Sequence, residues 1–267
     1  MFVNLQTLKP MKAPLFSINP DRNQPWNDLP DLPIHPDLYR TVAVMEQLGN
    51  AKSALGRLHG RSVAIPNQGI LINTISLQEA KASSEIENIF TTDDELYQAY
   101  SEEGEEVHIK GAPKEVLRYR EALWVGHEHL KKGDFDLEYF IKLYRIVKQT
   151  NDGLRPPSAR IYIKQGGTGP NAGTAIYTPP RGKGILEAKL QNLLDFVNDD
   201  EKYSIDPLIK MAMAHYQFEV IHPFRDGNGR AGRIFNINIL TQKGLLDLPI
   251  LYLSRYIIDH KSDYYCR

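Results

Sequence analysis

The sequence is poor in cysteine, in net charge and in long apolar runs, and each shortage excludes a class of protein. The single cysteine, Cys266, cannot form a disulfide within the chain, and no signal-peptide pattern opens the sequence, so we expect a cytoplasmic protein. The 32 basic and 33 acidic residues nearly cancel, which leaves no global field to attract nucleic acid or an anionic membrane. The apolar run at 208–220 contains Lys210 and Glu219, so no membrane span is predicted.

Prolines concentrate in the first 36 residues, where their density excludes a continuous helix. They are Pro10, Pro14, Pro20, Pro25, Pro30, Pro33 and Pro36. We therefore expect residues 1 to about 36 to form an extended arm. From Leu38 onward, apolar residues return every three or four positions, which predicts helices. The predicted helices before residue 150 span 38–55, 68–86, 94–102, 113–130 and 137–147.

Two short runs of strand-forming residues, 161–163 and 174–177, flank a glycine-rich loop. This pattern predicts a β-hairpin with a long, mobile tip. Helices are predicted again over 184–197, 206–221, 229–240 and from 250 to the end. We therefore expect an all-α fold, a helical bundle with one short β-hairpin. The last predicted helix has no Gly or Pro stop signal before Arg267, which leaves open that a C-terminal domain is absent from this chain.

The segment 206–221 is apolar almost all round, which predicts a helix that runs through the core. Pro223 disfavours the helical conformation at His222, so the helix should end there and place the imidazole at the start of a loop. Gly227 and Gly229 allow the backbone to turn sharply before the next helix. Unpaired amides at 227–229 would then face outward at the positive end of that helix, which makes a seat for phosphate.

The charged residues of this loop fit the same chemistry. Arg230 and Arg233 stand three positions apart and can bind phosphate oxygens bidentately. Asp226 fits a Mg²⁺ ion, which takes one carboxylate together with phosphate oxygens and waters. Each residue alone also has a structural interpretation, as a helix-terminal histidine, a turn-forming aspartate, a left-handed cap at Asn228 or solvated arginines. Because all of them fall within twelve positions that begin at His222, we favour a functional loop.

The run from His222 to Arg233, HPFRDGNGRAGR, resembles the full Fic signature HPFxxGNGRxxR. The resemblance extends over roughly residues 68–267 and includes the hairpin segment 177–180. It implies a Fic fold, a helical bundle with a short hairpin flap. Residues 68–267 are then expected to form the Fic domain with a preceding inhibitory helix, and residues 1–67 a proline-rich arm and an N-terminal helical region.

The resemblance implies a protein adenylyltransferase, which moves AMP from ATP onto a Ser, Thr or Tyr hydroxyl of a target protein. His222 would be the general base, Asp226 would hold Mg²⁺, and Phe224 would anchor the loop in the core. The implied nucleotide-binding residues are Gly227, Asn228, Gly229, Arg230 and Arg233. The arginines would steady the β- and γ-phosphates of ATP.

A second match lies upstream, where Ser83, Glu87 and Asn88 fit the inhibitory pattern [S/T]xxxE[G/N] of one Fic class. Ser83 and Glu87 share a helix face at this spacing. The resemblance implies that Glu87 pairs with Arg233 and keeps the γ-phosphate from seating, so that the enzyme is autoinhibited. The structural alternative is a solvated glutamate near a helix end, with Asn88 as its cap.

Two other functions stay open from the sequence. In one, Glu87 orients a water that removes AMP from a modified protein; in the other, the chain senses nucleotide without transfer. The expected partners are a target protein and the chain itself as a substrate, with no membrane and no direct nucleic acid, and a homo-oligomer stays open. We expect the target to add as a strand to the hairpin edge near Ile176 and Tyr177, with a plain surface hairpin as the alternative.

Overall fold

The computed structural model describes residues 21–101, 111–164, 172–261 and 264. Within these ranges it is a helical protein with one small antiparallel sheet, which confirms the all-α expectation. The helices are α1 (Pro36–Tyr39), α2 (Val42–Val63), α3 (Gln68–Ile86), α4 (Asp93–Ser101), α5 (Ala112–Leu130), α6 (Leu137–Lys148), α7 (Ile185–Asn198), α8 (Pro207–Ile221), α9 (Asn228–Gln242) and α10 (Leu253–Asp259). The strands are β1 (Ile163–Lys164) and β2 (Ala175–Tyr177).

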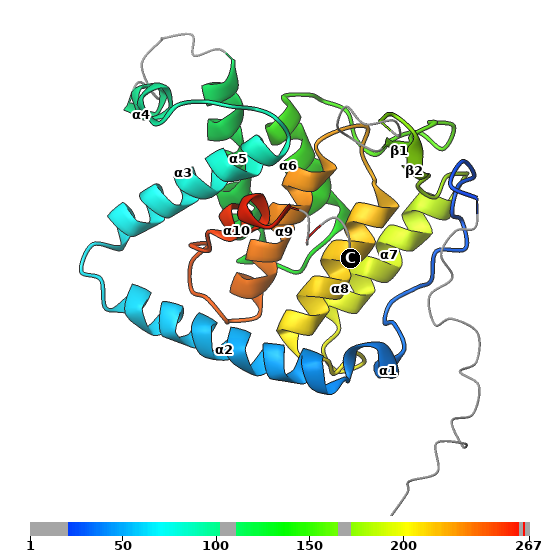
Figure 1. Ribbon diagram of the computed structural model, residues 1–267, viewed down its shortest axis with the longest axis horizontal. Helices are drawn as coiled ribbons and strands as arrows, with labels where there is room; N and C mark the ends of the chain where they lie inside the picture. Colours follow the sequence, from blue (N-terminus) through cyan, green and yellow to red (C-terminus); the bar gives the residue numbers. More distant parts are fainter. Residues whose placement is uncertain (1–20, 102–110, 165–171, 262–263, 265–267) are drawn as a thin grey trace, which may run out of the picture.

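Helix α9 lies at the centre of the fold. It packs against α5, α6 and α8, while α7 covers the other side of α8 (Figure 1). Aromatic rings join these helices: Phe140 of α6 stacks on Phe218 of α8 at 4.8 Å and meets Phe235 of α9 edge to face at 4.9 Å. Such contacts stabilise a core beyond the apolar area that they bury. The helix that carries the second half of the signature, α9, is therefore rigidly supported.

Local signals fix both ends of α8, as the sequence predicts. The Asp206 side chain accepts a hydrogen bond from the Leu208 amide at 3.0 Å, and Pro207 occupies the first turn. At the other end, Pro223 follows His222, which takes the left-handed conformation at φ 51°. The predicted boundaries, 206–221, are met within one residue.

The amino-terminal half of the fold differs from the expectation in two places. Residues 21–35 form no helix, as predicted, but this segment packs onto the fold: Trp26, Leu29 and Leu32 are buried in the main core, because apolar side chains between the prolines have a surface to cover. The first 20 residues lie outside the described ranges. The single helix predicted over 38–55 is also wrong, because Thr41 caps a new helix, α2, which continues to Val63.

Helix α3 packs against α5 and α10, and its last turn points toward the start of α9. It ends in a Schellman motif, in which the Ile89 amide donates to the Ser84 carbonyl at 3.0 Å and the Asn88 amide to the Glu85 carbonyl at 3.1 Å. Asn88 takes the left-handed conformation, with φ at 61°. Glu87 is the C-cap residue of this helix.

Strands β1 and β2 pair antiparallel, with Ile163 opposite Tyr177 and Lys164 opposite Ala175. The hairpin lies at the same end of the molecule as the turn between α8 and α9 (Figure 1). Most of its glycine-rich tip, 165–171, falls outside the described residues. Among the described helices, none combines the length and the apolar character that crossing a bilayer requires.

Candidate active site

His222 sits at the point where α8 ends, and its surroundings select one form of the imidazole. Its Nδ1 lies 3.3 Å from the Glu219 carbonyl oxygen, which can only accept a hydrogen bond. Nδ1 therefore carries the proton, and the Nε2 lone pair is left to accept another. Burial lowers the pKa of His222 to about 4, so the ring is neutral at physiological pH. A neutral imidazole with an available nitrogen has the form that a general base requires.

Two side chains, those of Arg155 and Tyr177, hold the end of α8 in place. The sequence did not predict this role for either. The buried Arg155 donates from Nε to the His222 carbonyl at 2.8 Å and from its terminal nitrogen to the Ile221 carbonyl at 3.1 Å. The Tyr177 hydroxyl donates to the Val220 carbonyl at 3.0 Å. These bonds satisfy carbonyls that a helix end leaves without partners, and they fix the backbone that carries His222.

The loop after His222 is clamped from inside by Asn228. This side chain is 2% exposed; its Oδ1 accepts from the Phe224 amide at 2.9 Å and its Nδ2 donates to the Phe224 carbonyl at 3.0 Å. The Phe224 ring is fully buried and stacks on Tyr144 at 4.2 Å. Both polar atoms of the Asn228 side chain are bonded to the backbone of Phe224. The contact expected between Asn228 and phosphate would therefore be made by its backbone amide.

The first turn of α9 begins directly after this loop. Gly227 is its N-cap residue, at φ 74°, and no side chain in the described part of the chain caps this helix end. An uncapped helix N-terminus attracts anions through its amides and its dipole. The carboxylate of Glu87 lies against it, since a β-carbon on Gly229 would stand 2.4 Å from Glu87 Oε1. An acidic side chain thus occupies the place where the sequence predicts phosphate.

Arg233 joins this carboxylate to the core. Its Nε donates to Ser83 Oγ at 2.7 Å, and one terminal nitrogen donates to the Ser83 carbonyl at 2.9 Å and to Glu87 Oε1 at 2.8 Å. The pair that the resemblance implies, Glu87 with Arg233, is therefore present, and Asn88 is also the helix cap of the structural alternative. The segment thus contains both the ion pair and a left-handed Asn88 at the helix end, while Glu87 is not the solvated residue of the structural alternative.

Arg230 makes a contact that the sequence did not predict. The guanidinium, 2% exposed, donates from one terminal nitrogen to Glu115 Oε2 of α5 at 3.0 Å. Glu115 is one of several glutamates in the sequence, and nothing in its local pattern distinguishes it. Arg230 and Arg233 thus have different acidic partners, on α5 and at the end of α3.

Asp226 keeps an exposed carboxylate at the mouth of the loop, with its side chain 67% exposed. Its Oδ1 accepts from the Gly227 amide at 2.7 Å and its Oδ2 from Lys148 Nζ at 2.5 Å. Burial acts to raise the pKa of this carboxyl, but the hydrogen bonds from Lys148 and Gly227 outweigh it and hold the pKa below its ordinary value. An ionised single carboxylate beside a phosphate seat fits Mg²⁺, which is commonly held by one or two carboxylates together with phosphates and waters.

No group of three or more His, Cys, Asp or Glu side chains gathers into a metal cage within the described ranges. The residues around Asp226 therefore suit a metal that arrives with a phosphorylated ligand rather than one held by protein groups alone.

Two buried carboxyls lie near Arg233 that the sequence did not reveal. Glu79 is fully buried, accepts hydrogen bonds from the Tyr119 hydroxyl at 3.1 Å and the Ser254 amide at 2.8 Å, and has its pKa raised by burial to about 7. Burial likewise raises the pKa of Glu219 to about 7, and its Oε1 has no hydrogen-bond partner among the described residues. Arg233 thus has two neighbouring carboxyls, those of Glu79 and Glu219, that are partly neutral at physiological pH.

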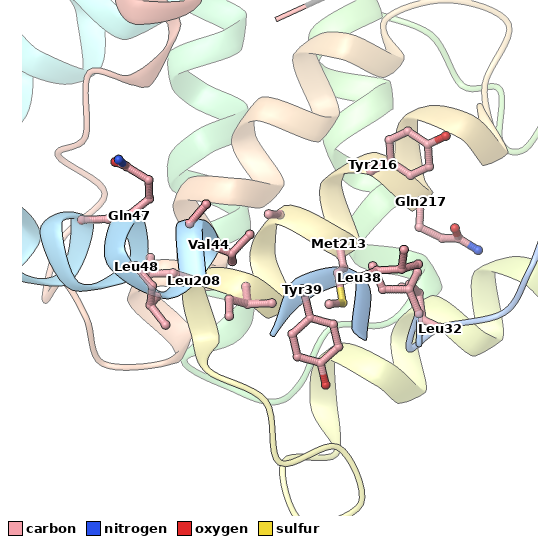
Figure 2. A pocket seen from close by; sticks show the side chains of 15 residues that line it. Leu32, Leu38, Tyr39, Val44, Gln47, Leu48, Leu208, Met213, Tyr216 and Gln217 are labelled. Carbon is pink, nitrogen blue, oxygen red and sulfur yellow. The ribbon is translucent and has the colours of Figure 1, made fainter. Parts of the chain in front are cut away.

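A large apolar cavity, about 620 Å³, lies elsewhere, between the start of α2 and the first turns of α8. Leu48, Tyr39, Leu208 and Met213 are among the side chains around it (Figure 2). None of its described lining residues is charged, so it offers nothing to hold phosphate. The loop between α8 and α9 is therefore the candidate active site.

Comparison with known proteins places this site in a family. Residues 45–128 match the family model described as Fic/DOC family N-terminal, and residues 134–240 match the model described as Fic/DOC family. The chain is 25% identical over 146 residues to protein adenylyltransferase fic-1 of Caenorhabditis elegans, which is 53% of this chain and 26% of that protein. It is 48% identical over 83 residues to a probable protein adenylyltransferase of Aquifex aeolicus, which is 31% of this chain and 25% of that protein. The chain thus spans about a quarter of the length of these relatives.

Solved structures show the same fold. A Fic family protein from Desulfovibrio desulfuricans G20 aligns with a TM-score of 0.61 at 21% identity, covering 85% of this chain and 65% of that one. Fic-1 from Caenorhabditis elegans aligns with a TM-score of 0.59 at 19% identity, covering 85% and 66%. The two family models, the signature loop and the shared fold agree, and the chain belongs to the Fic/DOC family.

Proposed function

We propose that this chain is a protein adenylyltransferase, which moves AMP from ATP onto a hydroxyl of a target protein. The observation that carries the proposal is the neutral His222, whose Nε2 is available to accept a proton. His222 lies in the loop that leads directly to the uncapped N-terminus of α9. The names of the curated relatives support the same activity. The single Cys266 fits a reducing cytoplasm as its place of action.

In this mechanism the chain's own residues bind and orient ATP and remove one proton. The first-turn amides of α9 and the Arg233 guanidinium receive phosphate oxygens. Asp226 would hold Mg²⁺, which would supply positive charge to the phosphates. His222 Nε2 takes the proton of the target hydroxyl while that oxygen bonds to the α-phosphorus, and the bond from this phosphorus to pyrophosphate breaks. Fixed charges and dipoles of this kind contribute most of the catalysis in phosphoryl and nucleotidyl transfer.

The proposal includes a restraint by Glu87. Its carboxylate is bonded to Arg233 and lies against Gly229, at the entrance to the phosphate seat. A γ-phosphate that approaches Arg233 would meet a like charge, so ATP has to displace Glu87 before it can align. The resting chain therefore favours an unproductive nucleotide position.

Labelled ATP tests the transfer. The chain is incubated with ATP labelled at the α-phosphate, alone and with cell extract, and the protein-bound label is measured. His222→Ala should reduce transfer by about a hundredfold or more and leave ATP affinity nearly unchanged, because the imidazole acts on the hydroxyl rather than on the nucleotide. His222→Asn is the matched variant, since asparagine tolerates the left-handed conformation but offers no comparable base.

The outcomes separate the proposal from its alternatives. Undiminished transfer by both His222 variants would remove this residue from the role of base. ATP binding without labelled protein, also after the restraint at Glu87 is removed, would favour a nucleotide sensor. Release of AMP from a modified protein, without transfer, would favour the reverse reaction.

A further inference from the structure

Lys148, the last residue of α6, forms an ion pair with Asp226, the carboxylate that suits a metal. Its Nζ lies 2.5 Å from Asp226 Oδ2, and the other carboxylate oxygen accepts the Gly227 amide. Both oxygens of Asp226 are therefore engaged by the chain itself. A divalent cation that binds this carboxylate through Oδ2 has to displace the ammonium group.

The ammonium is held in place by more than the ion pair. The stem of Lys148 lies across the loop, because a β-carbon on Gly227 would stand 3.2 Å from both its Cγ and its Cδ. Its side chain is only 27% exposed. Gln149 ends α6 in the left-handed conformation, so Lys148 lies at the negative end of this helix, where a cation is favoured. The pair is thus built into the site rather than formed by two loose side chains.

We infer that Lys148 competes with the divalent cation for Asp226 and so sets the cation concentration at which nucleotide binds. The inference rests on the proposed function for the identity of the ligand, a metal–nucleotide complex. Lys148 carries one positive charge and the ion carries two. Even after displacement, the tethered ammonium stays close and repels the incoming ion. Removing the charge should therefore strengthen metal binding, whereas a lysine that served as a phosphate ligand would give the opposite sign.

The test measures metal binding directly. Mn²⁺ serves as a visible substitute for Mg²⁺, and its free concentration is followed by electron paramagnetic resonance as it is titrated into the full chain with a non-hydrolysable ATP analogue. Lys148→Met keeps the apolar stem over Gly227 and removes the charge. Lys148→Arg keeps the charge. Lys142→Met is the matched control, because Lys142 is an exposed lysine on the same helix.

Lys148→Met should lower the Mn²⁺ concentration at half-saturation by roughly two- to fivefold, the range expected for a partly exposed ion pair. Lys148→Arg and Lys142→Met should stay within about 1.5-fold of the unmodified chain, since neither removes a charge from Asp226. In an Asp226→Asn background, the effect of Lys148→Met should become smaller, because only the direct repulsion between the ammonium and the ion is left.

Weaker Mn²⁺ binding by Lys148→Met would overturn the inference in favour of a direct phosphate contact, and unchanged binding would reduce the pair to a structural one. Thermal melting of each variant shows that it is folded. Failure of the proposed function is separate, because the Mn²⁺ titration does not depend on AMP transfer. A chain that binds metal and nucleotide as described but labels no protein would refute the transferase and leave the competition standing.

Discussion

At the residue scale, the pair between Glu87 and Arg233 makes the sharpest prediction. A charge-assisted hydrogen bond contributes about 1.5–3 kcal/mol, or roughly tenfold to a hundredfold in an equilibrium. The Glu87 side chain is 37% exposed, which places the pair at the weaker end of that range. Glu87→Gly should therefore raise AMP transfer about tenfold, measured as self-modification with labelled ATP. Glu87→Asp should activate less, because its shorter carboxylate still approaches Arg233.

A double variant separates restraint from loss of stability. Arg233→Ala combined with Glu87→Gly should be inactive, since it removes the phosphate partner that the first substitution releases. The inhibitory interpretation of the segment from Ser83 to Asn88 is wrong if Glu87→Gly folds and binds ATP but transfers AMP no faster. The segment would then be a capped helix end and nothing more.

Also at the residue scale, Glu79 couples stability to pH. Its folded-state pKa of about 7 lies above the ordinary value of 4.5, so the folded chain holds this proton more tightly than the unfolded chain. Its contribution to stability is complete below pH 4.5 and is lost as pH rises to about 7, by on the order of 3 kcal/mol. Glu79→Gln cannot ionise and keeps an acceptor for the Ser254 amide.

Denaturant unfolding of both proteins between pH 4.5 and 8 checks this. The free energy of unfolding of Glu79→Gln, minus that of the unmodified chain, should rise over this interval. A difference that stays constant with pH would mean that Glu79 is already ionised in the fold at pH 4.5, or equally perturbed in the unfolded chain.

At the element scale, strand β2 has one anchored and one open side chain. Tyr177 is fixed by its bond to α8 and by an edge contact with Trp26 at 6.1 Å, while Ile176 is 43% exposed. An open strand edge can accept an extended target segment. Ile176→Pro should therefore reduce modification of target proteins several-fold and leave ATP binding unchanged, as followed by labelled AMP incorporation and by nucleotide titration.

Ile176→Val is the control for this strand, because valine keeps the backbone donor and the strand preference. Equal modification by the proline variant and this control would count against docking on the hairpin. The Tyr177 hydroxyl needs its own control, Tyr177→Phe, which removes the bond to α8 and leaves the strand intact. A loss of transfer confined to Tyr177→Phe would assign the hairpin to the support of α8 rather than to target binding.

Elements were predictable where their signals are local. The bounds of α8 follow from Asp206, Pro207 and Pro223, each of which acts within a few positions of the helix end. The helix predicted over 38–55 failed because Thr41 accepts a hydrogen bond from the Val44 amide and starts a new helix inside that range. Apolar periodicity continues across such a cap and does not reveal it.

At the scale of the whole molecule, the missed contacts are those between segments far apart in the chain. Arg155 reaches the end of α8, and Glu115 and Lys148 reach the two sides of the signature loop. These residues have no local pattern that distinguishes them from other charged residues on a helix or loop. The tertiary arrangement alone brings them to the site. The pair of Glu87 with Arg233 was anticipated, because a resemblance to a known family supplied the second position.

The same scale explains why the packing of residues 21–35 was not predicted. Proline content correctly excluded a helix, but side chains of other elements hold the segment. The side-chain amide of Asn192 accepts a hydrogen bond from the Leu32 amide at 2.8 Å and donates one to the Leu32 carbonyl at 3.1 Å. Such bonds replace the secondary-structure partners that prolines remove. The composition excluded a helix in this segment but gave no information on where the segment packs.

The Schellman end of α3 determines how firmly Glu87 is held in the restraint proposed above. The residue that closes this helix, Glu87, is also the residue that faces Arg233. Helix termini open and close continually, at a free-energy cost well below that of global unfolding. In the proposed restraint, an opening of this last turn would move the Glu87 carboxylate away from Arg233. Under the proposed restraint, we therefore expect the residual AMP transfer of the chain to depend on the stability of this one helical turn, which substitutions at Asn88 would change without contacting nucleotide, metal or target.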